Sequence, residues 1–167
     1  KILRYGQTLS FFDQRVIGRA VIYEDLGGIV NDGGLPGVLK RISGLLKERR
    51  PGMIIIDSFK ALHPYAPRDE DFRRFLHDLA GRLSAFPVTS FWVGEYGHDE
   101  IAGSAEFAVA DSILSLSVER AGGRELRVFQ VLKLRGSDFL SGKHAYRLSD
   151  DGIEFFPRLA DPVDQTP

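Results

Sequence analysis

The chain has 167 residues, and its composition of 43% hydrophobic, 27% charged and 11% aromatic residues is typical of a globular protein with a packed core. No apolar run approaches the roughly 20 residues of a membrane span, and the absence of cysteine excludes disulfides and thiolate metal sites. Because 22 Lys and Arg residues balance 23 Asp and Glu residues, the basic surplus typical of nucleic-acid binding is missing. We therefore expect no membrane and no nucleic-acid partner, and the lack of cysteine fits a cytoplasmic protein.

The chain begins with alternating helix and strand patterns. Apolar residues at Ile2, Leu9 and Phe12 predict an opening helix, and residues 20–23 predict a short strand. The Gly-rich stretch 27–34 predicts a loop.

Two amphipathic helices follow, each ahead of a short apolar strand. Helical spacing covers residues 35–50 and resumes after Asp69, whose carboxylate can cap the second helix. The strands are predicted at residues 53–57 and 88–93. Strands that alternate with helices favour an α/β fold with a mostly parallel sheet, whose ligands bind beyond the carboxyl ends of the strands.

Acidic residues follow both of these predicted strands. Asp57 ends the apolar run of the first, and Glu95 comes just after the second. A carboxylate in the position of Asp57 can hold the Mg²⁺ of a nucleotide-hydrolysing enzyme. The same residue can equally cap the next turn, and the pattern alone leaves both interpretations open.

The last third of the chain predicts antiparallel hairpins. Glycine-containing turns separate its extended runs, which are residues 113–118, 126–134, 146–148 and 153–156. No linker divides these hairpins from the preceding part. We therefore predict one domain over residues 1–159, with the hairpins as an antiparallel extension of the sheet, and a flexible tail over residues 160–167.

Two cations lie near the end of the run 126–134. Lys133 and Arg135 are two residues apart, so in a strand they share a face and lie about 7 Å from each other. Such a pair can bind an anion such as a terminal phosphate, or it can be a solvated basic edge.

The order of these pieces resembles the KaiC-like branch of the RecA-type ATPases, the family of the circadian clock protein KaiC. The resemblance covers nearly the whole chain, and a Lys-x-Arg-Gly-Ser step followed by a Gly-Ile hairpin is its most specific part. The matching positions are 54–58 as the Walker B strand, Glu95, 106–111, 132–137, Gly142, Tyr146, 151–153 and Pro157.

The resemblance implies a role for each candidate site residue. Asp57 would orient Mg²⁺, with Ser58 supporting its water shell, and Glu95 would sense the state of the nucleotide at the interface. In such rings, which we expect to be hexamers, ATP lies between subunits. Lys133 and Arg135 would then reach the γ-phosphate bound by the neighbouring protomer.

Two parts of the family pattern are missing from these residues. No Gly-x-x-x-x-Gly-Lys-Ser/Thr phosphate loop occurs, because Gly142 and Lys143 precede His144 in a hairpin and the glycines at 33–37 have no lysine. The acidic pair that activates water in this family is also absent. Either the natural chain supplies these parts before Lys1, or it is a truncated relative that does not hydrolyse ATP; we favour the first.

The leading hypothesis is that the chain is part of an ATP-binding and ATP-hydrolysing ring protein in signalling or clock-type regulation. This hypothesis includes autophosphorylation. The chain alone is expected to be inactive, because the phosphate loop and the catalytic glutamates are not in it. The alternatives are a DNA recombination or repair ATPase of the RecA or RadA type and an oligomerisation module that binds no nucleotide.

Overall fold

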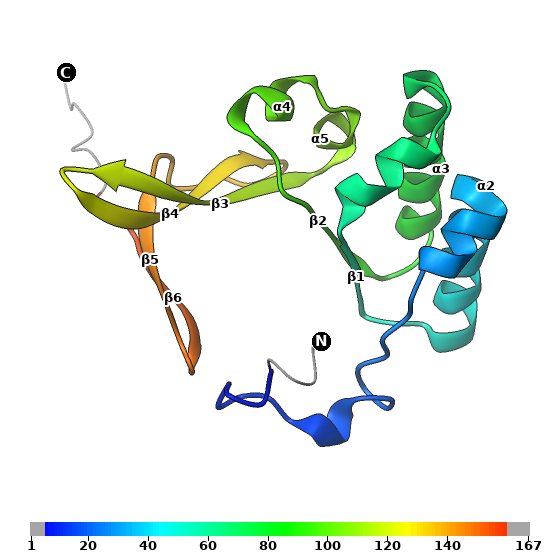
Figure 1. The fold of residues 1–167 in the computed structure, drawn as a ribbon, viewed down its shortest axis with the longest axis horizontal. Helices are drawn as coiled ribbons and strands as arrows, with labels where there is room; N and C mark the ends of the chain where they lie inside the picture. The colour runs from blue at the N-terminus through cyan, green and yellow to red at the C-terminus, as the bar shows by residue number, and fades with distance from the viewer. Residues whose placement is uncertain (1–5, 160–167) are drawn as a thin grey trace. The chain divides into compact units, whose positions relative to one another are not determined.

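The computed structural model describes residues 6–159, apart from the side chains of His98, Asp99, Ala102 and Ala121. The chain forms two compact units (Figure 1). Glu24–Ala110 forms the helical unit, and the described parts of Lys1–Tyr23 and Asp111–Pro167 form the hairpin unit. The division into one domain over residues 1–159 stays a prediction, and the predicted tail over residues 160–167 lies outside the described residues.

The helical unit contains a two-stranded parallel sheet and five helices. Its elements in chain order are α2 (Gly27–Arg49), β1 (Met53–Asp57), the 3-10 helix η2 (Phe59–Tyr65), α3 (Asp69–Ser84), β2 (Thr89–Val93), α4 (His98–Gly103) and α5 (Ala105–Val109). β1 pairs with β2 in parallel, with Asp57 opposite Val93. Figure 1 shows α2 and α3 side by side next to these strands.

The predicted loop over residues 27–34 is wrong, because these residues are helical and belong to α2. Burial of Val30 against the core outweighs the low helix propensity of the glycines. A kink at Gly34, with φ of 59°, divides the helix and places Pro36 in the first turn of its second half, where a proline is tolerated.

Apolar residues of α2 and α3 form the core of the helical unit together with β1 and η2. On α3 these are Phe72, Phe75, Leu76, Leu79 and Leu83, at the helical spacing that the sequence predicted. Asp69 is the first residue of α3 and not its cap; Asp69, Glu70 and Asp71 place negative charge in the first turn, where the helix dipole favours it.

The sheet confirms the α/β class, and the described residues contain a smaller parallel part than predicted. Residues 20–23 do not form a strand, since Val21 makes only an isolated bridge to Ile17. The parallel sheet in the described part of the chain therefore has two strands, β1 and β2. Its outer face exposes Met53, Ile55, Phe91 and Val93.

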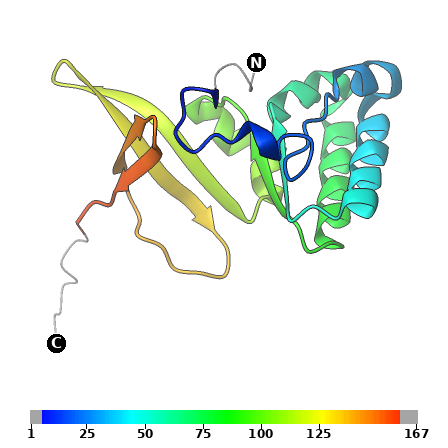
Figure 2. The same cartoon turned by 90° about the horizontal axis from the view of Figure 1, so that it is seen from below.

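The hairpin unit confirms the predicted antiparallel strands, but among the described residues they form a separate sheet and not an extension of the β1–β2 sheet. β3 (Ser112–Ala121), β4 (Arg124–Leu134), β5 (His144–Ser149) and β6 (Gly152–Phe156) form one sheet in the order β3-β4-β5-β6 (Figure 2). Gly122 and Gly123 connect β3 to β4 with φ of 56° and 77°, the left-handed conformations that a two-residue hairpin turn requires.

The described residues ahead of η1 (Gln14–Val16) contact the β5–β6 turn, and the helix predicted for the start of the chain lies partly outside the described residues. Residues 7–11 form turns, and η1 is a single 3-10 turn. Ile2 lies outside the described residues. The Ser10 amide donates to the Asp150 carbonyl at 2.9 Å, and its hydroxyl donates to Asp151 at 2.7 Å, which fixes this segment to the β5–β6 turn.

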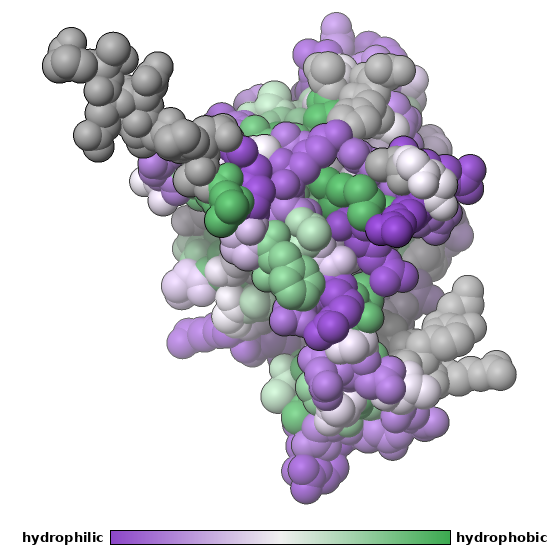
Figure 3. All heavy atoms as spheres, turned by 90° about the vertical axis from the view of Figure 1, so that its left-hand side faces the viewer, coloured by the Kyte–Doolittle hydropathy of each residue, from purple (hydrophilic) through white to green (hydrophobic). Residues whose placement is uncertain are grey.

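Some exposed side chains are apolar and lie among hydrophilic ones. On β3, Leu114, Leu116 and Val118 lie on one face and are more than half exposed. Figure 3 shows apolar groups among hydrophilic ones on one side of the molecule. None of the described helices is long and apolar enough to cross a membrane.

Candidate functional site

The parallel pairing of β1 and β2 brings the acidic ends of both strands to one edge of the sheet. Asp57 is the last residue of β1, and it lies opposite Val93, the last residue of β2. Glu95 follows two residues later, and both acidic side chains are exposed. The parallel arrangement that the sequence predicted therefore places the two acidic residues at the same edge, as expected for a ligand site of an α/β protein.

The Asp57 carboxylate is not used as a cap. Ser58 is the N-cap residue of η2, and no side chain caps this helix. Within residues 6–159, no hydrogen bond or ion pair involves the Asp57 carboxylate, which leaves its oxygens available to a ligand. Ser58 is also exposed, and the peptide bond that joins the two residues is cis.

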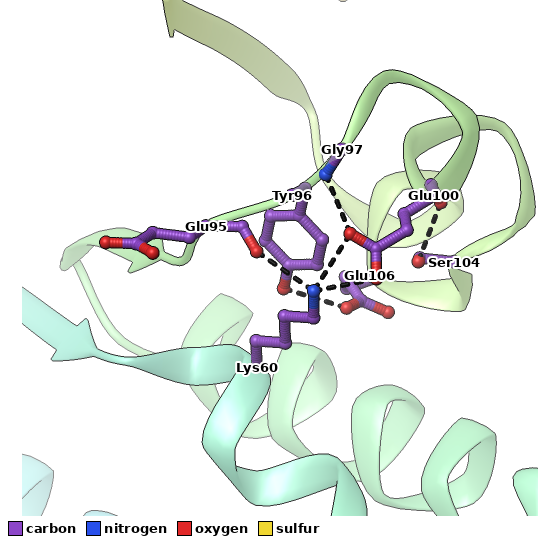
Figure 4. Close-up of polar contacts among 7 residues, drawn as sticks. All are labelled: Lys60, Glu95, Tyr96, Gly97, Glu100, Ser104 and Glu106. Atoms are coloured by element: carbon purple, nitrogen blue, oxygen red, sulfur yellow. Dashed lines mark hydrogen bonds and ion pairs between the residues drawn. The ribbon is translucent and has the colours of Figure 1, made fainter.

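An ammonium group connects the segments that follow the two strands (Figure 4). Lys60 lies in η2, three residues after Asp57, and its Nζ donates to the Glu95 carbonyl at 3.0 Å. The same Nζ lies 2.7 and 2.9 Å from the two carboxylate oxygens of Glu100 on α4. In Figure 4 the Glu95 carboxylate points away from Lys60, so the lysine contacts Glu95 only through its backbone.

The Glu100 carboxylate accepts hydrogen bonds from two donors. Its Oε2 accepts the Gly97 amide at 2.7 Å in addition to the Lys60 ammonium. Hydrogen bonding to Lys60, and then to the Gly97 amide, lowers the pKa of Glu100 below its ordinary value. The side chain therefore stays ionised at neutral pH and keeps both contacts.

Tyr96 anchors the same segment from the other side. Its hydroxyl donates to Oε1 of Glu106 on α5 at 2.8 Å, and Glu106 is only 7% exposed. The Tyr96 ring also meets Phe107 edge-on, with centroids 4.8 Å apart. Desolvation, followed by the hydrogen bond to Glu106, raises the pKa of Tyr96 above its ordinary value.

Replacing Tyr96 with Phe should destabilise the protein by about 1–3 kcal/mol, because Glu106 would remain buried without its donor. The raised pKa means that the folded state retains the phenolic proton more strongly than the unfolded state. Its contribution to stability is present below about pH 10 and decreases as the pH rises above that value. Urea unfolding at pH 7, 9 and 11 measures both effects.

Tyr65→Phe is the matched control, because the Tyr65 hydroxyl bonds to Asn31 at an exposed position. We expect it to cost less than about 0.5 kcal/mol. The Tyr96→Phe protein should lose less stability than wild type between pH 9 and 11. Equal losses in the two proteins would contradict the assignment of this titration to Tyr96.

The two predicted cations lie in the hairpin unit. Lys133 is half-buried and pairs with Ile113 of β3, and Arg135 is the first residue after Leu134, where β4 ends. Nη1 of Arg135 lies 3.2 Å from Oδ1 of Asp111, and both side chains are more than half exposed. Such an exposed ion pair contributes about 0–1 kcal/mol.

The described residues provide no preformed metal centre. Among residues 6–159, no three His, Cys, Asp or Glu side chains gather into a group that could hold a metal ion. Mg²⁺ commonly binds through one or two carboxylates, water and substrate phosphates, so a single exposed aspartate at the sheet edge fits this ion.

Comparison with known proteins identifies the family. The family described as "ATPase: KaiC" matches residues 26–160. The chain belongs to the KaiC family of RecA-like ATPases.

Two curated relatives are cyanobacterial. The circadian clock oscillator protein KaiC of Picosynechococcus sp. PCC 7002 is 29% identical over 133 residues, which cover 77% of this chain and 26% of the relative. KaiC 1 of Synechocystis sp. PCC 6803 is 30% identical over 133 residues, with 77% and 25% covered. The chain thus spans about a quarter of the length of these relatives.

A solved structure supports the fold. The crystal structure of a KaiC-like protein from the archaeon Pyrococcus horikoshii OT3 aligns with a TM-score of 0.66 and 18% identity. The alignment covers 75% of this chain and 58% of the archaeal chain. At this identity the similarity establishes a shared fold.

Sequence reasoning did not find the side chains that hold the Glu95 segment. Lys60, Tyr96 and Glu100 carry no motif of the KaiC family that we identified. One signal was present: Glu100 comes three residues after Gly97, the spacing at which a glutamate can accept the amide of a helix N-cap. The partner of Lys60 lies 40 residues away, and local sequence patterns carry no information about it.

Proposed function

We propose that this chain is the part of a KaiC-family ATPase that carries the Mg²⁺-binding aspartate and the residues contacting a neighbouring subunit. The observation that supports this most directly is the exposed Asp57 carboxylate. It ends a strand whose neighbour leads to Glu95, and within the described residues it has no partner of its own. An acid that merely terminated a turn would bond to that turn.

In this proposal Asp57 and Ser58 hold Mg²⁺ and its water shell together with the phosphates of ATP. Their exposed oxygen atoms are the hard ligands that this ion prefers. When bound, the ion neutralises charge on the phosphate oxygens during transfer. Glu95, at the same edge, responds to whether the nucleotide is bound or hydrolysed.

Lys133 and Arg135 act on the ATP of an adjacent copy in a ring, which we propose to be a hexamer. A cation placed at the γ-phosphate stabilises the charge that spreads over its oxygens in the transition state. The exposed position of the Arg135 side chain supports this role, because a neighbouring subunit can reach it.

The proposed ATPase activity belongs to a longer chain. The 167 residues contain no phosphate loop, so we propose that they do not hydrolyse ATP alone. In this proposal, turnover drives conformational change or autophosphorylation in a signalling or clock-type assembly. The support for this role is that similar relatives are circadian clock oscillator proteins. We also propose that the protein is cytoplasmic.

Mixing two inactive variants tests the contact between subunits. In the full-length protein, Lys133→Ala should reduce ATP turnover about 10²-fold with little change in ATP affinity, because the lysine acts on the site of a neighbour. An Asp57→Ala protein lacks the ion-binding carboxylate of its own site. Copies of the two variants placed in one ring can form some complete sites, so the mixture should regain a measurable fraction of turnover in a coupled phosphate-release assay.

Arg124→Ala is the matched control, since Arg124 is an exposed cation at the opposite end of β4 from Lys133. It should leave turnover unchanged. A mixture of the Lys133 and Asp57 variants that stays inactive, although subunits demonstrably exchange, would argue against the shared site. Salt-dependent binding of single-stranded DNA would instead favour the recombination ATPase.

A further inference from the structure

The segment between β2 and α4 carries Glu95 and has no regular secondary structure. Residues 94–97 lie outside both the strand ladder and the helix. Three successive residues in it are each held by a side chain. Lys60 bonds the carbonyl of Glu95, Glu106 accepts the hydroxyl of Tyr96, and Glu100 accepts the amide of Gly97. The conformation at Glu95 therefore depends on side-chain contacts.

Among the side chains that make these contacts, Lys60 is the one that belongs to the segment following Asp57. Its ammonium reaches both Glu95 and Glu100, and Glu100 in turn holds Gly97. Its Nζ also lies 5.2 Å from the centroid of the Tyr96 ring. One side chain thus connects the end of β1 to all three anchored residues after β2.

We infer that Lys60 is a positioning residue that fixes Glu95 relative to Asp57. The inference rests on the proposed function, since it assigns Lys60 a role in nucleotide turnover. Lys60 holds Glu95 by its carbonyl and leaves the carboxylate pointing away from the cluster (Figure 4). It does not touch the reacting atoms; it keeps the two acid-bearing segments at a constant distance.

The contacts of Lys60 suit positioning better than stabilisation. Its side chain is 41% exposed and that of Glu100 is 48% exposed, so the ion pair adds little to global stability. The same contacts restrict a short irregular segment beside a proposed active site, where a small displacement strongly reduces the rate. The expected signature is a large effect on turnover with a small effect on unfolding.

The test uses Lys60→Met in the full-length protein, which keeps the length of the side chain and removes the ammonium. We expect kcat for ATP to fall about tenfold, with KM within about twofold of wild type and an almost unchanged Tm. Lys60→Arg should restore at least half of the activity, because a guanidinium can donate to both acceptors. Lys40→Met, at an exposed position of α2, is the matched control and should behave as wild type.

Amide hydrogen exchange provides a readout that does not depend on activity. In Lys60→Met the Gly97 amide should exchange at least about fivefold faster, while the amides paired between β1 and β2 keep their protection. The combination Lys60→Met with Glu100→Gln should reduce kcat no further than Lys60→Met alone, because the residues act as one unit.

The results of these experiments distinguish a failure of the Lys60 inference from a failure of the proposed function. An active wild-type protein whose Lys60→Met variant keeps kcat within twofold overturns the inference and leaves the proposed function intact. A full-length wild type that neither binds nor hydrolyses ATP overturns the proposed function and, with it, the catalytic role of Lys60. Unchanged exchange at Gly97 overturns the positioning role in either case.

Discussion

Replacing Asp57 with Asn in the full-length protein should lower ATP turnover by about 10³-fold and leave the folded state unaffected. The proposed ion contributes several kcal/mol of charge stabilisation, and each 1.36 kcal/mol corresponds to a factor of ten in rate. Asn keeps the size of the side chain and removes the charge that holds the ion. Because the Asp57 carboxylate is exposed and bonds to no described residue, its loss should change Tm by less than about 1 °C.

Phosphate release measures turnover, and calorimetry in the absence of nucleotide measures Tm. Asp78→Asn is the matched control, since Asp78 is an exposed aspartate on α3. It should leave both quantities unchanged. Full turnover by the Asp57→Asn protein would remove the central residue of the proposed site, and a large loss of Tm would show that Asp57 has a structural role.

Regular hydrophobic spacing explains why much of the fold could be predicted. The apolar residues of α3 recur at helical spacing and form its buried face. β1 is a short apolar run between Gly52 and the charged Asp57. The glycines at 122 and 123 marked the turn between β3 and β4. In each of these places the local pattern and the tertiary contacts agree.

The predictions failed where tertiary contacts override the local signal. Residues 27–34 contain four glycines, and they are helical because Val30 packs into the core. Residues 20–23 contain β-branched residues, but Val21 and Ile22 are exposed, so no packing stabilises a strand there. β-propensity reflects a suitable neighbouring surface, and this short segment does not find one among the described residues.

The residues of the candidate site also differ in whether the sequence could predict them. Asp57 and Glu95 could be found because the ends of parallel strands define a ligand edge without any knowledge of distant contacts. Lys60 and Glu100 could not, because their contact depends on how η2 and α4 approach each other. The motif residues and the residues that hold them in place therefore carry different kinds of sequence signal.

Replacing Phe59 with Ala should destabilise the protein by about 3–5 kcal/mol, the usual cost of removing a fully buried aromatic ring. Phe59 is 0% exposed, and its ring stacks on Trp92 with centroids 4.4 Å apart and planes within 4°. Phe72 and Phe75 of α3 complete its surroundings. Since the net stability of a domain is about 5–15 kcal/mol, this single change removes a large share of it.

Urea unfolding followed by the fluorescence of Trp92, the single tryptophan, measures this loss. Phe59→Leu keeps much of the apolar volume and should cost about 1–1.5 kcal/mol, and Tyr23→Ala, at a side chain that is 73% exposed, should cost less than about 0.5 kcal/mol. Phe59 lies between Asp57 and Lys60, so its ring also anchors the segment that carries both. Turnover in the full-length Phe59→Leu protein should therefore fall at temperatures where the protein remains folded. A cost below about 1 kcal/mol for Phe59→Ala would show that this ring does not hold the segment in place.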